Sequence, residues 1–109
     1  MAIESRVENQ VEILKIQGTL NAQNVDQVKS HIQKILAGSS RIALLDLEYL
    51  EEIDSSGIGA IVSLLKRMRM QKRDVRIFRL RGTVKKLFEL LRIDKSMEVF
   101  EDWDKALAC

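Results

Sequence analysis

The segment from residue 54 to residue 59 places a carboxylate and two hydroxyls directly before two glycines, in the order Asp54-Ser55-Ser56-Gly57-Ile58-Gly59. A serine hydroxyl can receive a phosphoryl group, and it can also cap a helix by accepting a backbone N–H. An aspartate beside it can cap the helix too, or orient the loop. Glycines permit unusual backbone angles and close approach of neighbouring groups, which is the expected role of Gly57 and Gly59. The segment therefore predicts either a modifiable binding loop or a simple helix cap.

The flanking segments place these groups where a loop runs from a strand into a helix. Residues 41–47 form an almost continuous apolar run, which is typical of a strand in the interior of a sheet. A short acidic link follows at residues 48–52. From Ile58 to about Met70, apolar residues recur at helical spacing. The hydroxyls should therefore lie at a helix N-terminus, where backbone N–H groups are unpaired and the helix dipole is positive.

Other chemistries lack the residues that they need. Cys109 is the only cysteine, so no internal disulfide and no cysteine-based zinc site can form. His31 is tied to no nucleophile by any motif, and the Ser-Ser-Gly-Ile-Gly run is not a nucleophile elbow. Glu51 and Glu52 are adjacent and do not converge on one substrate. We therefore expect no enzyme, no catalytic residue, no metal site, no cofactor and no small-molecule substrate.

Length and composition indicate one domain, residues 1–109. Apolar residues make up 46% of the chain, which is ordinary for a globular protein. The first residues carry charges and no apolar core of a signal peptide, and no run approaches the ~20 apolar residues that cross a bilayer. We expect a cytoplasmic protein with no membrane partner.

The remaining segments predict an α/β fold. Residues 3–7 and 11–17 read as an antiparallel hairpin, after which Gly18 breaks the pattern. A helix follows over residues 25–36, with Asn24 and Gln27 as a variant capping box. Residues 75–80 predict a strand, and Val84, Leu87, Phe88 and Leu91 predict the buried face of a third helix. A short strand at 99–100 and a helix at 101–108 can complete the chain.

This alternation indicates right-handed crossovers between parallel strands. The expected fold class is α/β, with a mixed, mostly parallel sheet, an N-terminal antiparallel hairpin and helices packed on it. The expected order is β-β-α-β-α-β-α, followed by an optional strand and a final helix. The order of strands within the sheet does not follow from one sequence.

Charge is segregated along the chain, although the net charge is only +2. Residues 46–54 hold five acids and no base, whereas residues 66–92 hold eleven bases against two acids. The basic stretch reads first as a solvated face of two helices, and alternatively as a site for nucleic acid, an anionic membrane or an acidic protein. Because Phe78 and Phe88 are predicted core residues, aromatic rings for base stacking are scarce, and we expect no nucleic-acid partner.

The loop at 54–59 after an apolar strand resembles the signature of the anti-sigma factor antagonists, the bacterial STAS domains. Gly18-Thr19-Leu20 before the first helix is similar to the Gly-x-Leu/Ile step of that family. The length and the order of elements also fit. The resemblance thus covers essentially the whole chain and implies the STAS fold.

The resemblance implies a regulatory function. In such proteins the serine that follows the aspartate, here Ser55, is phosphorylated by an anti-sigma factor that is a serine kinase. The unphosphorylated form binds this kinase and frees a sigma factor, and the phosphorylated form does not bind. The resemblance assigns the docking surface to Asp54, Ser56, Gly57, Ile58 and Gly59, with Asn21 nearby.

One departure from the family leaves alternatives open. Where the family usually has aspartate after the Gly-x-Leu step, this chain has Asn21, which keeps the size but removes the charge. The change bears more on phosphorylation of Ser55 than on binding. A constitutive STAS subunit of a lipid or anion transport complex is therefore an alternative function, and a nucleic-acid-binding domain is a further one.

Overall fold

A computed structural model describes residues 1–108 of the chain and leaves Cys109 outside the described residues. The elements, in chain order, are β1 (Ala2–Glu8), β2 (Val11–Leu20), α1 (Val25–Ala37), β3 (Ile42–Asp46), β4 (Leu50–Ile53), α2 (Ser55–Met70), β5 (Asp74–Phe78), α3 (Gly82–Leu90), the 3-10 turn η1 (Ile93–Lys95), β6 (Glu98–Phe100) and α4 (Trp103–Leu107). This order confirms the predicted mixed α/β fold.

The sheet has the strand order β1-β2-β3-β5-β6, with β1 antiparallel to β2 and the other pairs parallel. The predicted N-terminal hairpin is therefore confirmed. Asn9 and Gln10 form its two-residue turn, and both have positive φ angles, of 52° and 64°. Such turns match the right-handed twist of the two strands that they join.

Strand β4 was missed by the prediction, which treated residues 48–52 as a link and Gly18 as a break. The structure continues β2 through Gly18, with a φ of +89°, and β4 pairs in parallel with Gly18–Leu20 after a register shift. Within β4 only Leu50 is buried, and the two following glutamates are exposed. A strand of four residues with two exposed acids has the composition of a loop, so its pattern gives little signal.

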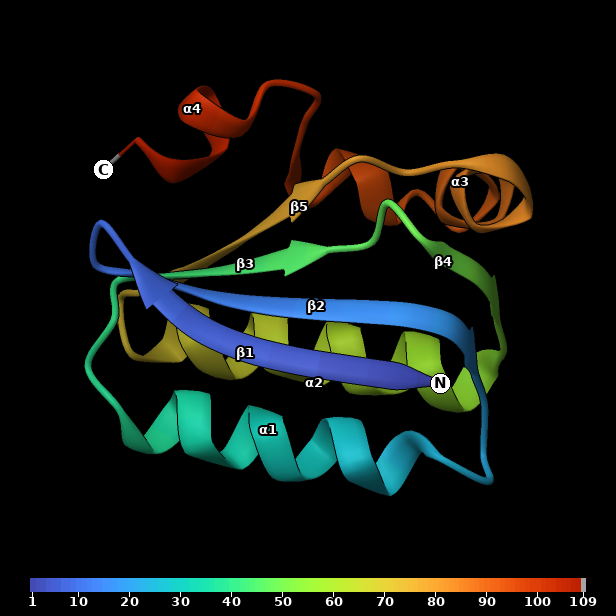
Figure 1. Cartoon of the computed structure of the whole chain (residues 1–109), viewed down its shortest axis with the longest axis horizontal. Coiled ribbons are helices and arrows are strands. Elements are labelled where there is room, and N and C mark those ends of the chain that lie inside the picture. The colour runs from blue at the N-terminus through green and yellow to red at the C-terminus, as the bar shows by residue number, and fades with distance from the viewer. Residues whose placement is uncertain (109) are drawn as a thin grey trace.

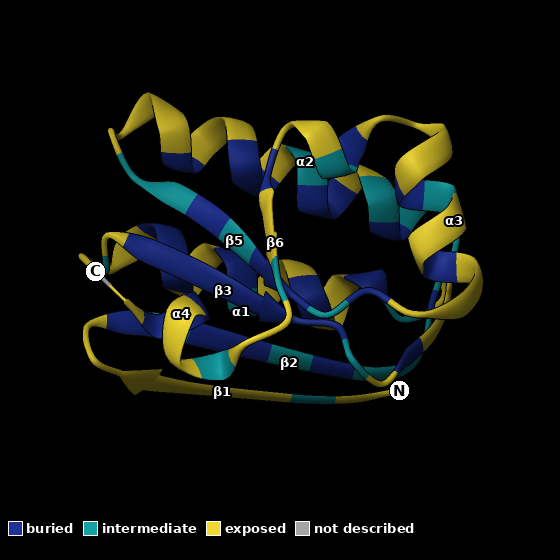
Figure 2. Cartoon of the chain, turned by 90° about the horizontal axis from the view of Figure 1, so that it is seen from above, coloured by how far each residue is buried: buried dark blue, intermediate teal, exposed yellow. Residues whose placement is uncertain are grey.

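The sheet carries helices on both faces (Figure 1), so its middle strands are covered from both sides. Helices α1 and α2 lie on one face over the larger core, to which Leu45, Leu64 and Phe88 belong. Helix α4 lies on the other face, where Ala106 and Leu107 pack against a smaller cluster of strand residues. All five residues of β3 are buried, whereas β1 is mostly exposed along the edge of the sheet (Figure 2). Double-sided burial explains the nearly continuous apolar run of β3.

Helix α3 differs from its prediction at its last turn. Val84 and Phe88 are buried as expected, but the helix ends at Leu90. Arg92 then adopts a left-handed conformation with a φ of 58°. Because the chain changes direction there, Leu91 leaves the buried stripe and is 51% exposed. The predicted placement of Leu91 on the buried face is wrong.

Candidate functional site

Asp54 caps helix α2. One of its carboxylate oxygens accepts hydrogen bonds from the backbone N–H of Ser56 at 2.9 Å and of Gly57 at 3.1 Å. The helix begins at Ser55, three residues before the predicted start. Two of the N–H groups expected to be unpaired are therefore occupied. The aspartate, and not a serine, supplies the cap.

The same carboxylate joins the start of α2 to the loop before α1. Its other oxygen accepts a hydrogen bond from the backbone N–H of Ala22 at 3.1 Å. The backbone N–H of Asp54 in turn donates to the carbonyl of Leu20 at 3.1 Å. These bonds place Asn21, which lies between Leu20 and Ala22, beside the first turn of α2. The structure thus brings together two segments that are 32 residues apart in sequence.

The loop before α1 is closed by its own asparagines. The side-chain oxygen of Asn24 accepts from the backbone N–H of Asn21 at 2.9 Å, and its side-chain amide donates to the carbonyl of Thr19 at 2.8 Å. Asn21 accepts from the N–H of Gln23 at 2.9 Å. Asn24 therefore makes no side-chain cap on α1, and the predicted capping box with Gln27 is wrong. The amide at Asn21 organises the loop without adding charge.

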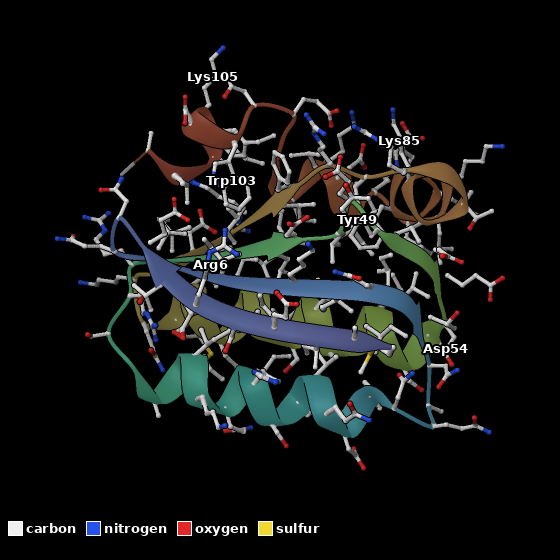
Figure 3. All side chains as sticks on the ribbon, in the orientation of Figure 1. Arg6, Tyr49, Asp54, Lys85, Trp103 and Lys105 are labelled. Atoms are coloured by element: carbon white, nitrogen blue, oxygen red, sulfur yellow. The ribbon has the colours of Figure 1, made fainter. Side chains whose placement is uncertain are left out.

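Ser55 is exposed, and its hydroxyl has no hydrogen-bond partner within residues 1–108. Ser56 is half-buried, and over the same residues its hydroxyl has none either. Figure 3 shows Asp54 at the N-terminal end of α2, beside the loop that leads into α1. A kinase or a docking protein can therefore reach the Ser55 hydroxyl without breaking an internal bond.

The two glycines of the loop differ in role. A Cβ on Gly57 would lie 2.7 Å from a side-chain carbon of Ile53 and 2.8 Å from one of Leu20, so the helix approaches the sheet closely there. A Cβ on Gly59 would meet nothing within 4 Å. Neither glycine has a positive φ. Close approach is confirmed at Gly57 alone, while Ile58 between them is half-buried against the core.

Gly59 instead opens a groove between α1 and α2. The groove has a volume of about 320 Å³ and is lined from α2 by Ser55, Gly59, Ser63 and Arg67, and from α1 by Lys29, Ile32 and Gln33, among others. The α2 residues recur every four positions, which is the spacing of one helix face. The recurrence of small residues at Ser55, Gly59 and Ser63 is a sequence signal for this groove, which the expected site does not include. The Ser55 hydroxyl thus lies at the end of a groove that carries two cations, Lys29 and Arg67.

Part of the basic stretch of residues 66–92 is used for contacts within the chain, although most of its bases are exposed. Five arginines have polar partners: Arg69 pairs with Asp74, Arg73 binds carbonyls at the end of α1, Arg76 binds carbonyls of α4, Arg79 pairs with Glu48, and Arg81 pairs with Glu101. The hydrogen bond to Glu48 raises the pKa of Arg79. Arg79 also lies over the ring of Phe78, 4.9 Å from its centroid. These side chains hold elements together, so they do not form one continuous free basic face.

The acidic stretch contains one buried carboxylate, Asp46, which is 8% exposed at the end of β3. Burial raises the pKa of Asp46, while a hydrogen bond from the N–H of Glu48 and the charge of Lys15 oppose this shift. Asp46 and Lys15 are paired across β2 and β3, on the face away from α1 and α2. Asp46 is therefore separate from the Ser55 loop.

Two absences bear on the site. Among residues 1–108, no group of three or more histidine, cysteine, aspartate or glutamate side chains is placed to hold a metal ion. Over the same part of the chain, no helix has both the length and the apolar character needed to cross a membrane.

Comparison with known proteins gives the family and the fold. The family model described as the STAS domain matches residues 2–106. An anti-sigma factor antagonist from Mycobacterium paratuberculosis is 17% identical, with a TM-score of 0.87 over 97% of this chain and 90% of that one. The phosphorylated form of the Bacillus cell fate determinant SpoIIAA is 18% identical, with a TM-score of 0.77 over 97% and 96%. A sulfate transporter family protein from Wolinella succinogenes is also 18% identical, with a TM-score of 0.77 over 94% and 85%.

Proposed function

This chain belongs to the STAS domain family, and from that premise we propose that it acts as an anti-sigma factor antagonist. The loop Asp54–Gly59 and the first turns of α2 dock an anti-sigma factor kinase while Ser55 is unphosphorylated. Phosphorylation of Ser55 ends the docking and returns the kinase to its sigma factor. The observation that carries the proposal is the exposed hydroxyl of Ser55 at the first residue of α2, which has no hydrogen-bond partner in the described part of the chain.

The charge of the modification gives the switch its direction. A phosphoserine adds about −1.5 to −2 charges at neutral pH. Asp54 already occupies the N–H groups of Ser56 and Gly57, so the phosphate meets a carboxylate where it would otherwise meet free donors. The helix dipole favours the phosphate by about 0.3–1 kcal/mol and the neighbouring carboxylate opposes it. The two effects are comparable, so the fold should change little.

Inside an interface the same charge has a much larger effect. An unpaired buried charge costs on the order of several kcal/mol, and each ~1.4 kcal/mol is a tenfold change in affinity. A phosphate on Ser55 therefore weakens docking through charge, without a rearrangement of this chain. In this proposal the ATP and magnesium belong to the kinase, the chain is not an enzyme and needs no cofactor, and its function is cytoplasmic.

Phosphorylation assays with candidate kinases test the modification. The protein, Ser55→Ala and Ser56→Ala are each incubated with a kinase that binds the unmodified protein, together with ATP. We expect phosphate to enter the unaltered protein and Ser56→Ala, and not Ser55→Ala. Phosphate located at another residue, or its absence with a kinase that binds, contradicts the proposed switch.

A constitutive subunit of a transport complex is the second candidate. Two observations favour it: Asn21 carries no charge next to the loop, and the fold is also that of the Wolinella protein. A Ser55→Asp variant that binds its partner as tightly as the unaltered protein would support this function over the switch. Nucleic-acid binding gains no support, because five of the eleven bases in the basic stretch have internal partners.

A further inference from the structure

A second groove lies beside the C-terminal half of α2, away from the Ser55 loop. It has a volume of about 340 Å³ and separates α2 from the turn between α3 and η1. Its apolar lining comes from Val62, Leu65, Leu91 and Ile93. Leu65 and Ile93 are buried, Val62 is half-buried and Leu91 is exposed, so the groove has a recessed apolar floor and one raised apolar wall.

The charged side chains that line this groove are all cationic. They are Lys66 and Arg69 from α2, and Arg92 from the turn. Arg69 is held by Asp74 and by the carbonyl of Ser96, whereas Lys66 and Arg92 have no ion pair or hydrogen bond from their side chains within residues 1–108. Two cations are thus left without counter-charges around an apolar floor.

The turn that carries Arg92 is unusual for this residue type. Its left-handed φ of 58° is a conformation that glycine adopts without strain. Arg92 occupies this position, where glycine is the usual residue after the C-terminus of a helix. Beside it, Leu90 is 78% exposed and Leu91 is 51% exposed. Of these two leucines only Leu91 lines the groove, so a partner bound there would cover its exposed side chain.

We propose that this groove binds an acidic amphipathic segment of a protein partner. Apolar side chains of the segment would enter the floor, and its carboxylates would pair with Lys66 and Arg92. The charge pattern of the groove selects this occupant, because cations surround an apolar lining that includes no acid. Its lining includes no aromatic ring for a nucleobase either.

The proposal is independent of the proposed switch. Ser55 and Lys66 are eleven residues apart on α2, which is about 16 Å along the helix axis. Charges in water separated by more than about 10 Å are largely screened at 0.1 M salt. A negative charge on Ser55 should therefore leave binding in the second groove almost unchanged. The groove can receive the same partner as the loop or a different one.

A synthetic peptide tests the groove directly. The probe is a fluorescein-labelled helix-forming peptide of about 16 residues, with leucines on one face and glutamates on the other. Its binding to the whole protein is followed by fluorescence anisotropy in ~0.1 M salt. We expect saturable binding, which Ser55→Asp changes by less than about twofold. A peptide of the same length with lysine in place of glutamate should not bind.

Two matched double variants locate the site. Lys66→Gln with Arg92→Gly removes both free cations, and the glycine keeps the left-handed turn. Lys85→Gln with Lys86→Gln removes the same charge from α3, where Lys85 extends away from α2 (Figure 3). We expect about a tenfold loss of affinity for the groove pair and less than about twofold for the α3 pair. Leu91→Ser should weaken binding about fivefold.

Several outcomes overturn the proposal. An equal loss in both double variants would mean diffuse charge attraction, and absence of saturable binding would mean that the groove does not take such a segment. If vesicles containing anionic phospholipid bind through Lys66 and Arg92 while the peptide does not, the ligand is a membrane surface. A large loss in Ser55→Asp would show that the groove and the loop are one site.

Discussion

The two ends of helix α2 present opposite chemistry. The first turns carry small side chains, an exposed hydroxyl and the capping carboxylate of Asp54, and an acidic strand precedes them. The second half carries long cations: Arg67 lines the groove beside α1, and Lys66 and Arg69 line the second, apolar-floored groove. Under the proposed switch, one helix offers a surface that phosphorylation of Ser55 alters, next to a surface whose charge is fixed. A single protein can in this way hold one contact constant while another is switched.

The largest expected effect is on the affinity for a kinase, and it tests whether the first turn of α2 is the docking surface. Ser55→Asp should lower the affinity for an anti-sigma factor kinase about a hundredfold, which corresponds to ~2.7 kcal/mol, because the charge becomes buried in the interface. Lys105→Asp adds a negative charge on α4, on the other face of the sheet, and should change this affinity little. Titration calorimetry measures both. An unchanged affinity in Ser55→Asp would place the docking surface elsewhere.

The two glycines at the start of α2 should respond in opposite directions. Gly57→Ala should lower the free energy of unfolding by about 1–3 kcal/mol, because its methyl group lies within 2.8 Å of Ile53 and Leu20. Gly59→Ala should raise that free energy by about 0.5–1 kcal/mol, since the site is open and alanine favours helix. Urea unfolding of both variants gives the comparison. Equal destabilisation would mean that the first turn is not pressed onto the sheet.

Removal of the cap at the acidic end should have a smaller effect. Asp54→Ala loses the hydrogen bonds to Ser56 and Gly57, and also the bond to Ala22, which together should reduce stability by about 1–2 kcal/mol. Asp54→Asn keeps one acceptor oxygen, so this variant should lose about half as much stability. Thermal unfolding measures the series, and a stable alanine variant would show that the cap contributes little.

The smallest expected effect is on the free energy of unfolding, and it comes from the buried carboxylate of Asp46 at the end of β3. Burial raises the pKa of Asp46 above its ordinary value of 3.8, so the folded state binds the proton more tightly than the unfolded state. Stability should therefore fall as the pH rises through the raised pKa. Asp46→Asn should be more stable than the unaltered protein at pH 7, by less than about 1 kcal/mol, and the advantage should shrink towards pH 4. If the higher stability of Asp46→Asn does not depend on pH, its cause is packing and not the charge of Asp46.

The sequence predicts the order of elements well, because most elements have a clear apolar period. The exceptions have physical causes. Leu50 is the only buried residue of β4, so no alternation marks that strand. Gly57 and Gly59 look alike in sequence, and only the packing of α2 on the sheet distinguishes them. Leu91 fits the helical stripe, and the left-handed turn at Arg92 removes it from the core.

The candidate site is partly predictable for a similar reason. Position in a loop before an apolar helix identifies Asp54 and Ser55, since helix starts have recognisable residue preferences. The side of the groove that comes from α1 depends on how two helices pack, and Lys29 carries no motif. The five tethered arginines look like a binding stretch when read along the chain. Their carbonyl and carboxylate partners lie up to 38 residues away.

Hydrogen bonds connect helices α1 and α2, or the residues that flank them, at both ends of the pair. Asp54 binds Ala22 at one end, and at the other Arg73 donates to the carbonyls of Ile35 at 2.9 Å and Ser40 at 2.7 Å. The width of the groove between the helices is therefore set before any partner arrives. Association then freezes few backbone degrees of freedom, so most of the contact energy remains available as affinity and encounter can be rapid.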